Sequence, residues 1–349
     1  MGQCAHLRNY VSNADCEVVA LADLRADLAK RVAARYGVSR VYKSHRELLT
    51  AEREIDGIVA ILPYHIHGQV VPELLEAGVP VLTEKPLARS VEMGERIVAA
   101  QKRSGARLLI AYNKRSDPAT MFAKKQIEEW KRSGEMGATR YVRITMPPGD
   151  WQAGGFSELL RGDDERPRLQ PDPPPEGMDE VAARRFDEFV NYYIHQVNLM
   201  RHLLGEAYGV RYADVPGVLM AVESQSAVTG TLEMAPYRTT ADWQERALVT
   251  FEKGWIRLQL PPPMAANRAG RVTVSRDPGQ GETPQEIVPQ LPHVHSMRQQ
   301  AAHFVQAVRG KPTCLCEAEE ALADLRVAKE YLNLWLAAQA RASCRCPDD

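Results

Sequence analysis

The stretch VPVLTEKPL, residues 79–87, joins a short run of β-branched and apolar residues to the charged tripeptide Glu84-Lys85-Pro86. The apolar run is typical of a buried strand. Proline restricts the backbone that follows Lys85, and open α/β sheets bind their ligands at the carboxyl ends of their strands. The pattern therefore predicts that Lys85 lies at the ligand-binding edge of a parallel sheet.

The segment before this stretch has the same character. Residues 56–62 form a second apolar run, which leads into Pro63-Tyr-His-Ile-His67 and then into a helical pattern over residues 68–77. The first 113 residues continue this alternation, with further strand-like runs at 16–22, 41–42 and 107–113 and helical patterns at 24–36, 45–51 and 91–103. Alternation of this kind predicts an α/β fold: a doubly wound, Rossmann-type parallel sheet with helices on both faces.

Strand, Pro-x-x-x-His, helix, strand and Glu-Lys-Pro, in that order, resemble the glucose-fructose oxidoreductase, inositol dehydrogenase and rhizopine-catabolism (Gfo/Idh/MocA) family. The resemblance extends over nearly the whole chain. It implies that the protein binds NAD, with NADP as a possibility, and moves a hydride between nicotinamide and a hydroxyl or carbonyl carbon of a sugar, inositol or related polyol. A non-catalytic ligand sensor or regulatory protein on the same scaffold is the alternative, because fold alone does not decide activity.

The character of the chain changes at Asp117. A helix with Pro118 in its first turn is predicted to reach residue 131, and longer strand-like runs follow at 139–146, 218–232, 247–252 and 255–260. With a helix over 186–204, these runs predict a second, α+β domain with a mostly antiparallel open sheet. We therefore expect an N-terminally incomplete dinucleotide-binding domain over residues 1–115 and a substrate and oligomerisation domain over residues 116–340. A surface loop is expected at 161–175, and closing helices at 297–308 and 317–338, which could pack on the first domain.

Composition narrows the class of protein. The 44 basic and 45 acidic side chains nearly balance, and no basic stripe appears, so nucleic acid is not an expected partner. No apolar run approaches the roughly 20 residues that cross a bilayer, and no membrane association is expected. We expect a cytoplasmic homo-oligomer that acts on a small-molecule polyol or sugar.

The six cysteines are few for this length and suit a reducing compartment. Two Cys-x-Cys pairs, at 314/316 and 344/346, leave a four-thiolate zinc site open as an interpretation. Their spacing departs from the usual Cys-x-x-Cys, and the interpretation as loop and tail residues predicts no metal.

The first residues, MGQCAH, look like the end of a Gly-x-Gly-x-x-Gly turn, with Gly2 as its last glycine, followed by a helix. The strand and two glycines that normally precede it are absent. That strand would lie between the strands predicted at 16–22 and 56–62, and each buried peptide group left unpaired costs about 1–3 kcal/mol. We expect the missing strand to be encoded upstream of Met1; a deliberately shortened protein is the alternative. The chain as numbered is expected to bind NAD poorly.

Several residues are candidates for coenzyme binding. Asp23 ends the second strand of the expected fold, where an acid hydrogen-bonds the adenosine ribose and repels a 2′-phosphate, which favours NAD. Arg25 could instead accept that phosphate, and Asp23 could also be an N-cap. The remaining candidates for contact with the coenzyme are Gly2, Pro63, His67, Glu84, Lys85 and Asn113.

The resemblance implies that Lys85 lies beside the nicotinamide and contacts the reacting hydroxyl group. An ordinary lysine has a pKa near 10.4, but desolvation can lower that value enough for proton transfer. The alternative is a solvated surface lysine.

The helix expected over 186–204 places Asn191, His195 and Asn198 on one face. The family carries acids at the two positions that are asparagine here, and an amide cannot accept a proton. Lys85 and His195 are therefore the predicted catalytic residues, with a packed core histidine as the alternative for His195. The remaining candidates for substrate contact are Asn113, Arg115, Trp151, Asn191, Tyr192 and Asn198.

Overall fold

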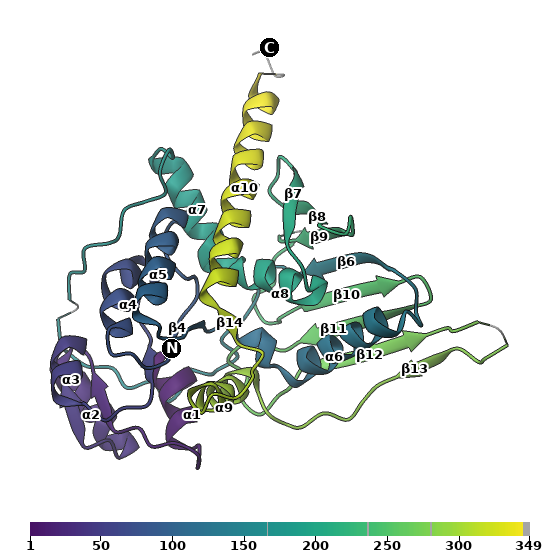
Figure 1. The fold of residues 1–349 in the computed structure, drawn as a ribbon. Helices are drawn as coiled ribbons and strands as arrows, with labels where there is room; N and C mark the ends of the chain where they lie inside the picture. The colour runs from purple at the N-terminus through teal and green to yellow at the C-terminus, as the bar shows by residue number, and fades with distance from the viewer. Residues whose placement is uncertain (166, 236, 280, 345–349) are drawn as a thin grey trace. The chain divides into compact units, whose positions relative to one another are not determined.

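The computed structural model describes residues 1–165, 167–235, 237–279 and 281–344, which form two compact units (Figure 1). The first unit combines Met1–Ala111, Gly154–Glu176 and Met297–Leu322. The second combines Tyr112–Ala153, Gly177–Ser296 and the residues from Ala323 onward. The sequence had placed residues 154–176 in the second domain, whereas the structure groups them with the first unit. Their hydrogen bonds to helices of that unit, described below, are the reason.

Parallel strands separated by helices make up the first unit, as the sequence predicts. β3 (Ile58–Ala60), β4 (Val81–Thr83) and β5 (Leu108–Ile110) are parallel neighbours, and β14 (Cys316–Glu317) pairs antiparallel with β5. The helices are η1 (Gly2–Leu7), α1 (Arg8–Val11), α2 (Ala26–Tyr36), α3 (His45–Ala51), η2 (Tyr64–Ile66), α4 (His67–Leu75), α5 (Val91–Ser104) and α9 (Ser296–Val308). Every residue of β4 and β5 is buried, which suits central strands of a parallel sheet.

The parallel strands form two separate sheets. β1 (Ala20–Ala22) pairs with β2 (Arg40–Tyr42), and within the described residues neither β1 nor β3 has a second strand partner.

The second unit is built on an eight-stranded sheet in the order β13-β12-β11-β10-β6-β9-β8-β7. Its neighbours are antiparallel except for β6 and β9, so the prediction of a mostly antiparallel sheet is confirmed. The strands are β6 (Thr139–Thr145), β7 (Tyr208–Ala213), β8 (Leu219–Ser224), β9 (Thr229–Glu233), β10 (Glu245–Phe251), β11 (Gly254–Leu260), β12 (Arg271–Arg276) and β13 (Gln285–Ile287).

One face of this sheet is covered by helices. Alternate residues such as Val142 and Ile144 of β6 are fully buried, and α6 (Pro118–Ser133) and α8 (Ile194–Leu204) pack on the sheet (Figure 1). The unit also contains η3 (Asn113–Ser116) and α7 (Glu180–Tyr192), and α10 (Ala318–Ser343) begins in the first unit and continues in the second.

Two predicted elements of the second unit are wrong. The helix expected over 186–204 is divided at Tyr193 into α7 and α8. Tyr193 stays in the right-handed helical region (φ −96°, ψ −3°), and its hydroxyl donates to the Met234 carbonyl at 2.5 Å. The single strand expected over 218–232 is instead the β8–β9 hairpin, with Ala227 at positive φ in its turn. The break at Tyr193 separates Asn191, on α7, from His195 and Asn198, on α8.

Asp117 caps α6 from a fully buried position. Its carboxylate accepts the N–H groups of Ala119 at 2.8 Å and Gly270 at 3.0 Å. A Cβ atom at Gly270 would lie 2.7 Å from the Asp117 carboxylate, so only glycine fits there. Burial raises the pKa of Asp117 to about 6, although its backbone hydrogen bonds oppose the rise.

This shift predicts a pH dependence of stability. The pKa of Asp117 in the folded state lies above its unfolded value of about 3.9. Asp117 therefore contributes fully to the free energy of unfolding below a pH of about 3.9, and this contribution is lost as the pH rises through about 6. The loss amounts to about 2–3 kcal/mol. The free energy of unfolding of the unmodified protein, relative to Asp117→Asn, should therefore fall by that amount between pH 4 and 7.

All five tryptophans belong to the second unit, so urea unfolding followed by tryptophan fluorescence reports on the part that contains Asp117. Asp179→Asn, at the exposed N-cap of α7, is the matched control and should show no such trend. A difference between Asp117→Asn and the unmodified protein that stays constant with pH would contradict this account.

Candidate active site

Lys85 follows β4 at the carboxyl edge of the first unit's parallel sheet, where the sequence predicts it. It is partly buried, and the peptide bond to Pro86 is cis. The Glu84 carboxylate accepts the Lys85 N–H at 3.2 Å and lies 2.7 Å from His6 Nε2. Burial alone would raise the pKa of Glu84, but the hydrogen bond and charge of His6 outweigh it, and the pKa is lowered. Glu84 therefore remains ionised and, through His6, joins η1 to the end of β4. The residues predicted from the sequence did not include His6.

His67 holds the loops around Lys85 in place. It is fully buried, with Nδ1 at 3.1 Å from the Leu87 carbonyl and Nε2 at 3.4 Å from the Leu62 carbonyl. Burial lowers the pKa of His67, so its imidazole is neutral at pH 7. The ring links the segment after Lys85 to the segment after β3, and Pro63 is exposed at the start of η2.

Asp23 and Arg25 form a close pair after β1. Asp23 Oδ1 accepts the Arg25 backbone N–H at 2.9 Å and its Nε at 3.1 Å, and Oδ2 accepts Nη2 at 2.9 Å. The N-cap of α2 is Arg25, not Asp23, so the interpretation of Asp23 as the helix cap is wrong. Both side chains remain more than a third exposed.

A dinucleotide fits the chemistry of this edge. Gly2 opens η1, and a Cβ atom placed there would meet nothing within 4 Å, which leaves room for close approach to its backbone. Asp23 offers a partly exposed carboxylate to ribose hydroxyls, and Lys85 lies at the end of β4. Of the glycine turn, the sequence contains only Gly2.

In the second unit, Arg115 and Asn198 belong to a buried network. Arg115 Nε donates to Asn198 Oδ1 at 2.7 Å, and Asn198 Nδ2 donates to Asp324 Oδ2 at 2.6 Å. Arg201 Nε donates to Asp324 Oδ1 at 2.7 Å. Asn198 thus uses both its acceptor and its donor, and an aspartate at this position would place a second carboxyl group beside the buried Asp324. Asn198 stands at a position where the family carries an acid, and its two hydrogen bonds in this network give the amide a structural role.

The other predicted substrate residues are spread over this unit. His195 packs edge to face on Tyr112, with ring centroids 5.8 Å apart, and is partly exposed. Asn113 Nδ2 donates to Ser296 Oγ at 2.7 Å. Tyr192 and Trp151 are partly buried, whereas Asn191 is exposed at the end of α7. The structure thus brings His195 close to the segment 112–115 and leaves Asn191 on the other helix.

Sequence reasoning missed a buried ion pair beside this segment. Lys114 bonds to Glu245, which also accepts Gln196 Nε2 at 2.7 Å and Trp243 Nε1 at 3.2 Å. Lys114 and Glu245 are 4% and 1% exposed, so neither charge is solvated. No local pattern links residues 114 and 245; the charged start of the apolar run 245–251 was the available signal.

Comparison with known proteins indicates which family the N-terminal segment resembles. Residues 1–112 match the family model described as oxidoreductase family, NAD-binding Rossmann fold. This segment, about a third of the chain, is similar to the Gfo/Idh/MocA family.

Curated relatives and solved structures agree with this assignment. An uncharacterised oxidoreductase, ORF334, of Rhizobium meliloti is 37% identical over 127 residues, which cover 36% of each chain. The chain thus spans about a third of the length of that relative. Inositol 2-dehydrogenase of Rhizobium meliloti is 26% identical over 281 residues, covering 78% of this chain and 77% of that one. An Agrobacterium radiobacter oxidoreductase, solved with NAD⁺, L-tartaric acid and magnesium, has a TM-score of 0.67 at 15% identity and covers 98% of this chain and 94% of its own.

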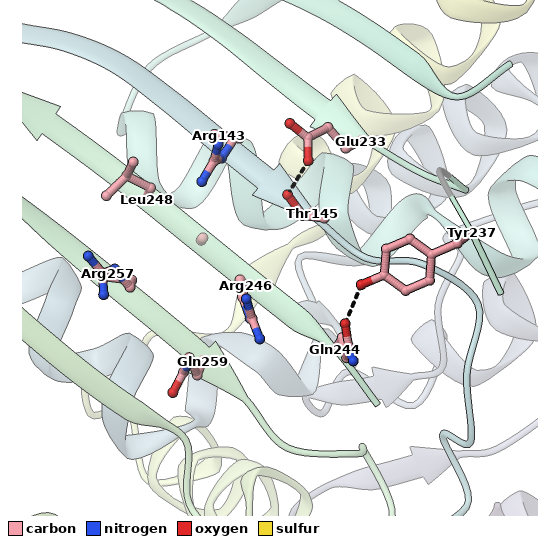
Figure 2. A pocket seen from close by; sticks show the side chains of 10 residues that line it. Arg143, Thr145, Glu233, Tyr237, Gln244, Arg246, Leu248, Arg257 and Gln259 are labelled. Atoms are coloured by element: carbon pink, nitrogen blue, oxygen red, sulfur yellow. Dashed lines mark hydrogen bonds between the residues drawn. The ribbon is translucent and has the colours of Figure 1, made fainter. Parts of the chain in front are cut away.

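The protein also has a cavity of about 410 Å³ on the open face of its eight-stranded sheet (Figure 2). Three arginines line it: Arg143 of β6, Arg246 of β10 and Arg257 of β11. Thr145 donates its hydroxyl to Glu233 at 2.6 Å in the same cavity. None of the predicted site residues lines it.

Two further features concern metals and membranes. Among the described residues, no group of three or more histidine, cysteine, aspartate or glutamate side chains could hold a metal ion. Cys346, one member of the second Cys-x-Cys pair, lies outside the described residues. Within the same part of the chain, no helix has the length and apolar character needed to cross a membrane.

Proposed function

We propose that this protein is an NAD(P)-dependent oxidoreductase that moves a hydride between nicotinamide and a hydroxyl or carbonyl carbon of a sugar, inositol or related polyol. The observation that carries the proposal is the position of Lys85 directly after a central parallel strand, between the ionised Glu84 and Pro86. The family match of residues 1–112 supports the coenzyme, and the similarity to inositol 2-dehydrogenase over most of the chain supports the class of substrate.

The chain's own residues supply binding and proton transfer. Bound NAD would supply the hydride acceptor or donor. Gly2 and Asp23 are proposed to bind the coenzyme, at the pyrophosphate and the ribose. Oxidation of an alcohol also releases the hydroxyl proton, and Lys85 and His195 are the groups proposed to take it. Glu84 is not available as a base because it is held by His6, and Asn191 and Asn198 cannot accept a proton.

The direct test follows nicotinamide absorbance while the protein, expressed with the in-frame codons upstream of Met1, is offered NAD or NADP with a panel of sugars, inositols and other polyols. The proposal expects reduction of the coenzyme with at least one of them, and loss of that reduction in Lys85→Met. Simultaneous binding of coenzyme and sugar without turnover on any panel member would instead favour the ligand-sensor alternative.

Coenzyme choice is proposed to depend on Asp23. The protein should bind NAD more tightly than NADP, and Asp23→Ala should narrow that preference. The substitution removes a carboxylate that repels a 2′-phosphate and releases the Arg25 guanidinium, which Asp23 holds through two hydrogen bonds. Dissociation constants for both coenzymes, measured by titration, provide the check. Asp56→Ala, at an exposed aspartate before β3, is the control. Equal affinities before mutation would contradict the role of Asp23.

We also propose that the protein is a cytoplasmic homo-oligomer. The open face of the eight-stranded sheet, with the cavity lined by Arg143, Arg246 and Arg257, is the proposed contact between copies. The five cysteines among the described residues form no disulfide with one another, which is compatible with a reducing compartment.

A further inference from the structure

The segment Gly154–Glu176, which we call the strap, contains no helix or strand among its described residues (Figure 1). It belongs to the first unit although it lies in the sequence between two parts of the second. Its length, its Pro, Asp and Arg content and its position had suggested only a surface loop.

One end of the strap is fixed to the beginning of α2. Asp164 accepts the N–H groups of Asp27 and Leu28, each at 3.0 Å. These are the second and third residues of the helix, whose own N-cap residue, Arg25, makes no side-chain cap. Asp164 therefore provides the carboxylate cap of α2 from 136 residues away.

The neighbouring residues of the strap contact η1 and the flank of α2. Gln3 and Leu160 form a reciprocal pair, in which Gln3 Nε2 donates to the Leu160 carbonyl and the Leu160 N–H donates to Gln3 Oε1, both at 3.1 Å. Arg31 Nη1 donates to the Arg161 carbonyl at 2.9 Å. Gln3 follows Gly2, so this part of the strap lies beside the start of η1.

A second aspartate fixes the strap to α4. Asp172 is 2% exposed; its Oδ2 accepts the Gly68 N–H at 2.8 Å, and its Oδ1 accepts Gln69 Nε2 at 3.0 Å. The Asp172 N–H also donates to the His65 carbonyl at 2.6 Å. Since α2 follows β1 and α4 follows β3, the strap connects two helix starts at the carboxyl edge of the parallel strands, the edge at which doubly wound folds bind dinucleotides.

The Asp164 end of the strap lies next to the Asp23–Arg25 pair. Arg25 directly precedes the first turn that Asp164 caps, and three charges, two negative and one positive, therefore gather there. The hydrogen bond from Asp23 is the largest cause that raises the pKa of Arg25, and the charge of Asp164 contributes in the same direction.

We propose that Asp164 is a second determinant of coenzyme choice, whose carboxylate disfavours the 2′-phosphate of NADP at the start of α2. The inference rests on the proposed function, because it requires the adenosine ribose to bind near Asp23. A 2′-phosphate would add two negative charges close to Asp23 and Asp164, with Arg25 already paired to Asp23. Unphosphorylated ribose adds no charge.

The test is coenzyme titration of Asp164→Asn, which carries no charge and whose single amide oxygen can keep one of the two hydrogen bonds that cap α2. The ratio of the NADP to the NAD dissociation constant should fall about 3- to 10-fold, and the effect should shrink at high salt. Asp172→Asn makes the same change at the other anchor of the strap and should leave the ratio unchanged. Thermal unfolding of each variant checks that the strap remains in place.

The outcomes separate the two proposals. If the unmodified protein binds NAD and Asp164→Asn leaves the ratio unchanged, or weakens both coenzymes equally, then Asp164 only caps α2 and the inference is overturned. An equal fall of the ratio in Asp172→Asn would overturn it as well. If the unmodified protein binds neither coenzyme, the proposed function fails and the inference fails with it.

Discussion

Lys85→Met is expected to lower turnover about 10²- to 10⁴-fold while changing NAD affinity little. The substitution keeps the unbranched side chain but removes the group proposed to take the hydroxyl proton, and the position after β4 is distinct from Gly2 and Asp23. Steady-state kinetics on a substrate found in the polyol panel, together with NAD titration, provides the measurement. Lys30→Met, at an exposed lysine of α2, is the matched control and should leave both quantities unchanged.

His195→Ala is expected to lower turnover in the same way, because the amides of Asn191 and Asn198 cannot accept a proton in its place. If both groups act on one proton, the losses in the Lys85→Met/His195→Ala double variant should be less than additive. Asn191→Asp should raise activity or leave it unharmed, since Asn191 is exposed. Full turnover in both single variants would eliminate the proposed catalytic residues.

Lys114→Met is expected to lower the free energy of unfolding of the second unit by about 3–5 kcal/mol, because it leaves Glu245 charged and buried without its cation. Tryptophan fluorescence during urea unfolding reports on this unit. Adding Glu245→Gln to the same chain should recover most of the loss. The new amide carries no charge, and its single oxygen can still accept from one of Gln196 and Trp243, which bond to different oxygens of Glu245.

Arg211→Met breaks an exposed ion pair with Glu223 in the same unit and should cost only about 0–1 kcal/mol. Two results would contradict the proposed contribution of the buried Lys114–Glu245 pair to the free energy of unfolding. One is a loss in Lys114→Met no larger than in this control, and the other is a double variant as unstable as Lys114→Met alone.

The sequence by itself determined features that depend on neighbouring residues. The helix over 45–51 has the predicted limits, with Ser44 accepting the Glu47 N–H at its start. The helices that precede Gly37 and Gly105 end where glycine adopts positive φ. The place of Glu84-Lys85-Pro86 after a buried strand is also confirmed. Hydrophobic periodicity, caps and glycine stops act within one or two turns, so a local pattern contains them.

Only the tertiary structure decided the features that join distant residues. Asn198 looked like an acid replaced by an amide until Asp324, 126 residues away, showed why an amide is needed. The helix break at Tyr193 accompanies a bond to Met234, and the cap of α2 comes from Asp164. The physical reason is that a buried polar group must find a partner, but the identity of that partner depends on which strands and loops become neighbours, and no local periodicity records this.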